Sequence, residues 1–323
     1  MRYHDDILGT IGKTPLVKLN KVARNVKPLV LAKVEFFNPG GSVKDRMAVY
    51  MVEEAVRKGL LKPGGTIVEN TSGNTGIGLA LYAAVKGYRA IFTIPDKMSR
   101  EKIDLLRAFG AEVIICPTAV PPDSPESYYE VAKRIVRDTP SSYLVNQYHN
   151  QDNVEAHYRT TGPEIWEETE GRIDYLVAGA GTGGTISGAG KFLKEKKPGV
   201  KVIGVDPIGS IYHDWFRYKS VIESHVYMVE GIGEDMLCET MHFAVMDDII
   251  QANDRDSFLM ARRLVREEGI LAGGSSGSVV CAALKVCEDL LEDKVVVVIL
   301  PDTGRNYMSK IFNDDWMKEK EFI

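Results

Sequence analysis

The chain has few cysteines and no paired thiol motif. Only 4 of its 323 residues are Cys, and none of them forms a C-x-x-C pair. This low count excludes a disulfide-rich secreted scaffold and favours reduced thiols in the cytoplasm. The 6 histidines show no spacing typical of metal ligands, so we expect no metal centre.

Long apolar runs and an excess of basic residues are also absent. The longest strongly apolar stretch, residues 295–300, is far too short to span a bilayer. Lys and Arg number 40 against 45 Asp and Glu, which disfavours binding to nucleic acid or an anionic membrane. The N-terminal stretch MRYHDDILGT has no apolar run, so we expect no secretory signal. These absences favour a cytoplasmic protein that binds neither nucleic acid nor membrane.

Strand-like and helix-like segments alternate along most of the chain. Expected strands cover residues 29–36, 66–69, 89–94, 112–116, 175–178, 202–205 and 295–300. Expected helices begin near residues 44 and 74 and cover residues 99–109, 124–138, 258–268 and 276–291. This alternation predicts an α/β architecture with mostly parallel sheets and crossover helices. A chain of this length exceeds the usual size of one core, so we expect two interwoven lobes.

The stretch NPGGSVKDR at 38–46 places a lysine at an unusual position. Ser42 and Asp45 fit a capping box, which puts Lys44 in the first turn of a helix. The helix dipole disfavours a cation at that end. Lys44 is then either a solvated surface lysine or an amine whose pKa is lowered, and a neutral amine can form a Schiff base.

Three glycine-rich loops each lie between an expected strand and an expected helix. They cover residues 71–76, 179–185 and 273–278. Loops at these places bind ligands in α/β proteins, and N–H groups at a helix start suit an anion. The second loop also satisfies G-x-G-x-x-G, and Asp206 ends the next expected strand. An NAD-dependent oxidoreductase is therefore one alternative.

A single cofactor would use all of these features. Pyridoxal phosphate needs an amine for its aldehyde, a cradle for its phosphate, and partners for its ring oxygen and nitrogen. A dinucleotide would leave Lys44 without a role. A protein that keeps the fold only for partner binding is a third hypothesis, which the intact Lys44, Asn74 and Ser275 disfavour.

Four motifs in this order, NPGGSVKDR, TSGNTGIGLA, GAGTGGTISG and GGSSGS, resemble the cysteine synthase/cystathionine β-synthase family of fold-type-II pyridoxal-phosphate enzymes. The resemblance implies two interwoven three-layer α/β/α domains. It implies a small mobile substrate-binding domain at 44–146 and a large cofactor-binding domain at 1–43 plus 147–323. It also implies a homodimer.

The resemblance also implies a role for individual residues. Lys44 would be the catalytic lysine that bonds to the cofactor, Asn74 would contact its ring oxygen, and Ser275 its ring nitrogen. The phosphate would lie on Gly181, Thr182, Gly183, Gly184 and Thr185. The substrate carboxylate would lie on Thr71, Ser72, Gly73 and Thr75 with help from Gln147, and Gly231 and Gly233 would line the entrance.

Several stretches, including VEGIGEDM and ILPDTGRNYMSKIF, resemble the cystathionine β-synthase branch of the family. That branch condenses L-serine with the thiol of L-homocysteine through an aminoacrylate, in transsulfuration, and hydrogen sulfide release from cysteine is a further reaction open to it. A cysteine synthase, which joins O-acetylserine and sulfide, is the alternative within the family.

The sequence departs from the family pattern at several positions. Asn70 replaces a common proline, Glu234 replaces a usual aromatic residue, and Pro121 and Pro122 replace a frequent basic-aromatic pair. Each change is expected to affect the second-substrate site. No Cys precedes Cys116, and the chain ends shortly after the motifs, so we expect neither the haem site nor the S-adenosylmethionine-binding module of some relatives.

Overall fold

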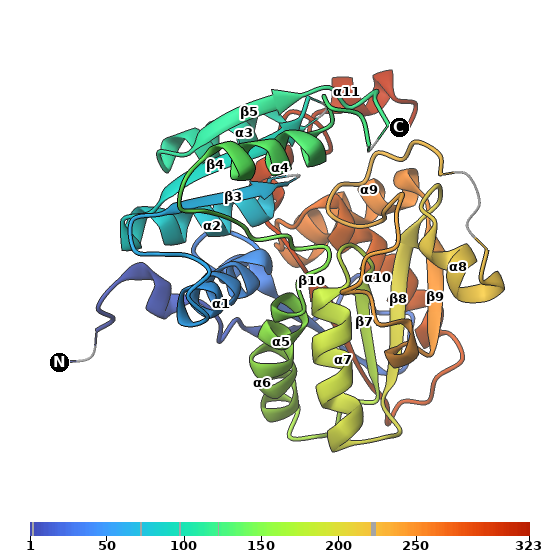
Figure 1. Cartoon of the computed structure of the whole chain (residues 1–323). Coiled ribbons are helices and arrows are strands. Elements are labelled where there is room, and N and C mark those ends of the chain that lie inside the picture. The colour runs from blue at the N-terminus through green and yellow to red at the C-terminus, as the bar shows by residue number, and fades with distance from the viewer. Residues whose placement is uncertain (2, 72, 97, 122, 221–223) are drawn as a thin grey trace.

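The computed structural model describes residues 1, 3–71, 73–96, 98–121, 123–220 and 224–323, and it contains two β-sheets surrounded by helices (Figure 1). The smaller sheet has the strand order β5-β4-β3-β6, and all of its pairs are parallel. Its strands are β3 (Thr66–Asn70), β4 (Arg89–Pro95), β5 (Glu112–Cys116) and β6 (Ser142–Leu144). This sheet therefore forms from one continuous stretch of chain.

The larger sheet combines strands from both ends of the chain. Its order is β1-β2-β10-β7-β8-β9, and of the described pairs in it only β1 with β2 is antiparallel. Its strands are β1 (Leu16–Lys18), β2 (Leu29–Val34), β7 (Tyr175–Gly179), β8 (Lys201–Pro207), β9 (Asp248–Ala252) and β10 (Val295–Leu300). The predicted α/β class with mostly parallel sheets is confirmed.

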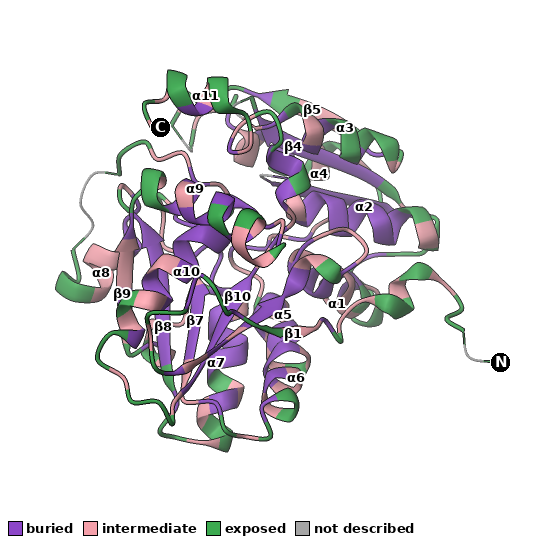
Figure 2. Cartoon of the chain, turned by 180° about the vertical axis from the view of Figure 1, so that it is seen from behind, coloured by how far each residue is buried: buried purple, intermediate pink, exposed green. Residues whose placement is uncertain are grey.

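Strand β10 is apolar on both faces because helices cover both sides of the larger sheet. Val296, Val298 and Leu300 belong to a core with residues of α9 (Asp254–Arg263) and α10 (Gly274–Cys287). Val297 and Ile299 belong to a second core with residues of α7 (Gly184–Lys196). The buried strands β7, β8 and β10 lie between these helices in Figure 2. Successive side chains of β10 point to opposite faces of the sheet and enter the two cores in turn. The sheet is therefore the middle of three layers, with helices on either side.

The smaller sheet is covered on both faces in the same way. One core joins strands β3 and β4 with α1 (Lys44–Arg57), α2 (Asn74–Lys86) and α3 (Arg100–Ala108). A smaller core on the other face contains Val68, Ile91 and Ala132 of α4 (Tyr128–Asp138). The remaining α-helices are α5 (Asp152–Arg159), α6 (Thr161–Glu168), α8 (Tyr212–Tyr218) and α11 (Asp314–Glu319).

Some predicted boundaries were wrong. The helix expected from residue 124 begins at Tyr128, because Ser127 caps it by accepting the N–H of Glu130. The helix expected at 258–268 begins at Asp254, and its last turn, Leu264–Glu268, is π-helical. The short strands β1, β6 and β9 were not predicted. Within the part of the chain that the structure describes, no helix has the length and apolar character needed to cross a membrane.

Candidate active site

A cavity of about 360 Å³ lies at the carboxyl ends of strands from both sheets. Pro95 at the end of β4, Gly179 at the end of β7 and Pro301 after β10 all contribute to its wall. Ligands of α/β proteins bind at this edge, and the volume suits a small cofactor or substrate.

Most of the residues predicted from the sequence meet in this cavity. Those that line it are Lys44, Asn74, Thr75, Gln147, Gly181, Thr182, Gly183, Thr185, Gly231, Gly233 and Ser275. Thr71, Gly73 and Gly184 do not line the cavity, but each is close in sequence to a residue that does. Ser72 lies outside the described residues. Positions distant in sequence are therefore brought to one place, as the motifs predicted.

Lys44 is the first residue of α1, and its side chain lines the cavity. Burial lowers the pKa of the Lys44 amine, although the charges of Glu234 and Asp302 act in the opposite direction. The direction of the shift agrees with the sequence analysis, and burial is its largest cause. A larger fraction of neutral amine follows, which is the form that attacks a carbonyl.

The capping box predicted at this helix start does not form. The Ser42 hydroxyl accepts the N–H of Lys44 at 3.2 Å, and Val43 is the capping residue. The Asp45 carboxylate instead accepts the N–H of Gly40 at 2.5 Å. Burial raises the pKa of Asp45 to about 7. Asp45 therefore stabilises the turn before Lys44, and its carboxyl group contacts the backbone of Gly40.

The loop at 71–76 is ordered by its own threonines. The Thr71 hydroxyl accepts the N–H groups of Gly73 and Gly76, at 3.0 and 3.4 Å. Gly73 has φ +124°, and a Cβ atom there would lie 2.7 Å from Lys102. The Thr75 hydroxyl donates to Gln147 Oε1 at 2.7 Å. Thr75 and Gln147 thus form a joint polar part of the cavity wall.

Asn74 and Ser275 approach the cavity from helices on its two sides. Asn74 begins α2, and its amide Nδ2 donates to Asp302 Oδ2 at 2.8 Å. Its Oδ1 is buried and has no hydrogen-bond partner. Ser275 is the second residue of α10 and is buried against the cavity. Both side chains are placed to face a ligand.

The loop between β7 and α7 is closely packed on its outer side. Gly183 has φ +94°, and a Cβ atom there would lie 2.5 Å from Met241 Cα. A Cβ atom on Gly181 would lie 2.7 Å from the Gly231 carbonyl oxygen. Only glycine fits at these positions, so the backbone N–H groups at the start of α7 stay open to the cavity. This geometry suits a phosphate group.

The two threonines of this loop have buried partners. Thr182 Oγ1 accepts from Asn153 Nδ2 at 3.2 Å. Thr185 Oγ1 lies 3.2 Å from His157 Nε2, and His157 Nδ1 lies 2.8 Å from Thr161 Oγ1. Burial holds the pKa of His157 well below its usual range, so the ring is neutral. The sequence analysis gave His157 no role, and its contact with Thr185 was visible only in the fold.

Asp206 does not support the dinucleotide alternative. It is the residue before the last in β8, and it does not line the cavity. Its Oδ2 accepts the N–H of His213 at 2.9 Å, at the start of α8. The carboxylate that would bind a ribose is thus used within the protein.

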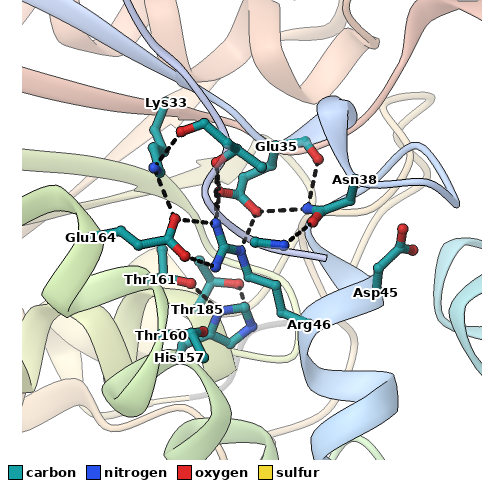
Figure 3. A network of polar contacts seen from close by, with 12 residues as sticks. Lys33, Glu35, Asn38, Asp45, Arg46, His157, Thr160, Thr161, Glu164 and Thr185 are labelled. Atoms are coloured by element: carbon teal, nitrogen blue, oxygen red, sulfur yellow. Dashed lines mark hydrogen bonds and ion pairs between the residues drawn. The ribbon is translucent and has the colours of Figure 1, made fainter. Parts of the chain in front are cut away.

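A buried ionic network around Arg46 supports α1, the helix that begins at Lys44 (Figure 3). The Arg46 guanidinium donates to both carboxylate oxygens of Glu35, at 2.7 and 2.9 Å, and to both of Glu164, at 2.7 Å each. Lys33 Nζ lies 3.0 Å from Glu164 and 2.8 Å from Glu168. The network connects α1 to β2 and α6, so it fixes the helix that carries Lys44 (Figure 3).

A family model described as "Pyridoxal-phosphate dependent enzyme" matches residues 7–302. The chain belongs to this family. Members use pyridoxal phosphate, and the cavity offers what that cofactor requires: an amine at Lys44, a glycine cradle at Gly181 and Gly183, and a buried hydroxyl at Ser275. Within the described residues, no cluster of side chains suits a metal ion.

Curated relatives in this family are cystathionine β-synthases. The chain is 53% identical to that of Mus musculus over 320 residues, which cover 98% of this chain and 57% of the relative. It is 46% identical to that of Saccharomyces cerevisiae over 327 residues, which cover 97% and 64%. The chain therefore spans between about half and two thirds of the length of these relatives.

Solved structures in the family are similar over nearly their whole length. An O-acetylserine-dependent cystathionine β-synthase from Helicobacter pylori superposes with a TM-score of 0.88 at 36% identity, covering 96% of this chain and 99% of the other. A hydrogen sulfide-producing enzyme from Fusobacterium nucleatum gives 0.87 at 35% identity, covering 94% and 100%. The fold-type-II assignment is confirmed.

Several residues in the cavity wall were missed by the sequence analysis. They are Tyr128, Tyr148, Tyr227, Asp302 and Lys310. Asp302 follows β10 directly, and this place at the end of a parallel strand could have identified it. The tyrosines carry no such signal, because only the packing of distant segments brings them together.

Proposed function

We propose that this protein catalyses a pyridoxal-phosphate-dependent β-replacement that joins L-serine to L-homocysteine and yields cystathionine. The observation that carries the proposal is the Lys44 amine, with its lowered pKa, in one cavity with the Gly181–Thr185 loop and Ser275. The relatives named cystathionine β-synthase, 46 to 53% identical, support the choice of reaction.

The cofactor would be held by groups already facing the cavity. We propose that Lys44 Nζ bonds to its aldehyde and that Gly181, Thr182, Gly183, Gly184 and Thr185 bind its phosphate. Asn74 would contact the ring oxygen and Ser275 the ring nitrogen. When bound, pyridoxal phosphate withdraws electrons from the substrate α-carbon. A hydroxyl at Ser275 leaves the ring nitrogen neutral, which favours β-elimination over transamination.

The substrate carboxylate would bind to the 71–75 loop. We propose Thr71, Ser72, Gly73 and Thr75 as this site, with Gln147 fixed by its bond to Thr75 and with Gly231 and Gly233 at the entrance. Lys44 Nζ would take the α-proton and return it, since its lowered pKa suits a general base.

The smaller sheet lies within the proposed mobile domain, residues 44–146. We propose that this domain closes over the bound substrate and excludes water from the reacting carbon. The remaining residues, 1–43 and 147–323, would form the cofactor-binding domain. We also propose a cytoplasmic homodimer that acts in transsulfuration, as the family resemblance suggests.

O-Acetylserine is a second candidate for the first substrate, and sulfide for the nucleophile. The structural relative from Helicobacter pylori is O-acetylserine-dependent, and the one from Fusobacterium nucleatum produces hydrogen sulfide. The same cavity would serve these reactions, because they differ only in the leaving group and in the nucleophile.

The test is the visible absorption of the purified protein loaded with pyridoxal phosphate. Serine should change the spectrum, and homocysteine should restore it while cystathionine appears by mass spectrometry. A response to O-acetylserine alone would transfer the assignment to the second candidate. No uptake of the cofactor would contradict the proposal.

The control is Lys44→Ala, which removes the amine and leaves the phosphate loop intact. We expect the variant to bind the cofactor without a covalent bond and to lose at least about 1,000-fold in kcat, the scale of removing a catalytic nucleophile and base. Borohydride reduction followed by peptide mass mapping would check the bond. Covalent labelling of the variant, or retained turnover, would contradict the role of Lys44.

A further inference from the structure

Glu234 stands in the cavity wall on a firmly held segment. Gly233 N donates to the Ala180 carbonyl at 2.6 Å, and Glu234 N donates to Ser210 Oγ at 3.0 Å. Ile211 N donates to the Glu234 carbonyl at 3.1 Å. Gly233 has φ +79°, and a Cβ atom there would lie 2.4 Å from Pro207. The backbone before and at Glu234 is therefore fixed, and the half-buried side chain is presented to the cavity.

The charge of Glu234 acts on groups around the same cavity. It opposes the lowering of the Lys44 pKa, and it adds to the effect of burial in raising the pKa of Tyr128 and Tyr148. These phenols line the cavity with it and stay neutral. Glu234 is half-buried in the wall of this cavity, and in such a partly desolvated space a carboxylate attracts a cation more strongly than it does in water.

Glu230 and Lys310 also line the cavity, and Lys102, which does not, pairs with Glu230 from the interior. The Glu230 carboxylate lies between Lys102 Nζ and Lys310 Nζ, at 2.7 Å from each. Burial would raise the pKa of Glu230, but the two ammonium groups lower it. Two ammonium groups around one carboxylate leave a net charge of about +1. The cavity wall therefore presents the Glu234 carboxylate and the Lys310 ammonium group as separate groups of opposite charge, which an amino acid zwitterion can use.

We propose that Glu234 binds the α-ammonium group of the second substrate and so selects an amino-acid thiol over sulfide or a simple thiol. The inference rests on the proposed function. The amino group of the first substrate bonds to the cofactor, so a further carboxylate for an ammonium group fits a second amino acid. Hydrosulfide has a negative charge and no ammonium group, so Glu234 opposes its entry. The Lys102–Glu230–Lys310 cluster would tolerate the carboxylate of the same substrate.

The experiment compares two thiols in the cofactor-loaded enzyme at saturating serine. One is homocysteine, and the other is 4-mercaptobutanoate, which has the same chain without the amino group. In the Glu234→Gln variant we expect kcat/KM for homocysteine to fall about 10- to 100-fold, the range for losing one charged hydrogen bond. The value for 4-mercaptobutanoate should stay level or rise, and KM for serine should not change.

Two further variants complete the test. Asp235→Asn removes the same charge from the adjacent exposed side chain, and we expect both thiols to react as in the wild type. Glu234→Asp keeps the charge and should restore part of the preference for homocysteine. The serine-induced spectrum would show that each variant is folded and loaded.

An equal loss for both thiols in Glu234→Gln would overturn the inference, because Glu234 would then act on the thiol proton or on the shape of the site. Equal use of both thiols by the wild type would also overturn it. These results leave the proposed function standing. A wild type that responds to serine but forms no thioether with either thiol would overturn the proposed function and the inference with it.

Discussion

Glu69 is a buried carboxylic acid that acts on the site through the backbone. Its two oxygens accept the N–H groups of Asn146 and Gln147, at 2.7 and 3.2 Å. Asn146 has φ +57°, a conformation that few side chains adopt. Gln147 Oε1 in turn accepts a hydrogen bond from the Thr75 hydroxyl. Glu69 therefore positions Gln147 in the cavity wall, at the proposed substrate site, although Glu69 itself does not line the cavity.

The environment of Glu69 predicts a dependence of stability on pH. Burial raises its pKa to about 8, while the unfolded value is about 4.3. Between these values the folded state holds a proton that the unfolded state releases, so stability falls as pH rises through this window. Relative to Glu69→Gln, the wild type should lose on the order of a few kcal/mol between pH 5 and pH 9. Urea denaturation of both proteins at each pH would measure this, and parallel curves would refute it.

Residues that line the cavity were easier to predict than residues that support its wall. Lys44, Asn74 and Ser275 stand in short motifs whose spacing carries the chemistry. Glu69 stands next to such a motif, but its partners Asn146 and Gln147 follow β6, which pairs with β3. The role of Glu69 depends on that pairing, which no local pattern in the sequence reports.

At the scale of elements, α5 and α7 cross so closely that a side chain at Gly188 would not fit. A Cβ atom there would lie 2.2 Å from the Val154 carbonyl oxygen and 2.8 Å from the Tyr158 nitrogen. Both atoms belong to the backbone of α5, so neither can move alone. The crossing also holds α7, which begins at Gly184 in the proposed phosphate-binding loop.

We predict that Gly188→Ala destabilises the protein by about 1–3 kcal/mol or more, because the helices must separate. Gly199 is the matched control, since it follows α7 and a Cβ atom there meets nothing within 4 Å. Gly199→Ala should change stability by less than about 0.5 kcal/mol. Thermal unfolding of both variants gives the comparison, and equal melting temperatures would exclude close packing at Gly188.

Whether a segment forms a helix or a strand was predicted from the sequence more accurately than the residues at which it begins and ends. Both ends of strand β10 were predicted correctly. Its run of Val, Ile and Leu is buried on both faces of the sheet, and the apolar run begins and ends with the strand. Strand β2 ends at Val34, before its predicted end, because Glu35–Phe37 forms a 3-10 turn. In that turn Glu35 turns inward to meet Arg46, a tertiary contact that the local pattern does not contain.

At the scale of the whole molecule, Arg46 joins parts of the chain that are far apart in sequence. It links α1, which packs on the smaller sheet, to Glu35 after β2 and to Glu164 of α6. Burial alone would raise the pKa of Glu164, but Arg46 lowers it to about 2. This stabilisation is present above the usual pKa of a glutamate and is lost as pH falls toward 2.

We predict that Arg46→Met destabilises the protein by about 3–5 kcal/mol near neutral pH, because Glu35 is left buried without its counter-charge. Arg57→Met on the same helix is the control, because Arg57 pairs with Glu54 at the surface. This substitution should lower the free energy of unfolding by less than about 1 kcal/mol. The difference in the free energy of unfolding between the two variants should be smaller in acid, where the carboxylates that Arg46 neutralises become protonated. Guanidinium titrations at pH 3 and pH 7 would test both statements, and a difference that grows in acid would contradict them.

The order of strands in the larger sheet also bears on how the protein forms during synthesis. β2 leaves the ribosome early, yet β10, the strand that it pairs with in parallel, lies more than 260 residues later and follows every other described strand. The four strands of the smaller sheet are consecutive and can assemble while translation continues. For most of that time β2 and β7 present unpaired edges. These two edges stay open to aggregation until β10 emerges and pairs with both strands.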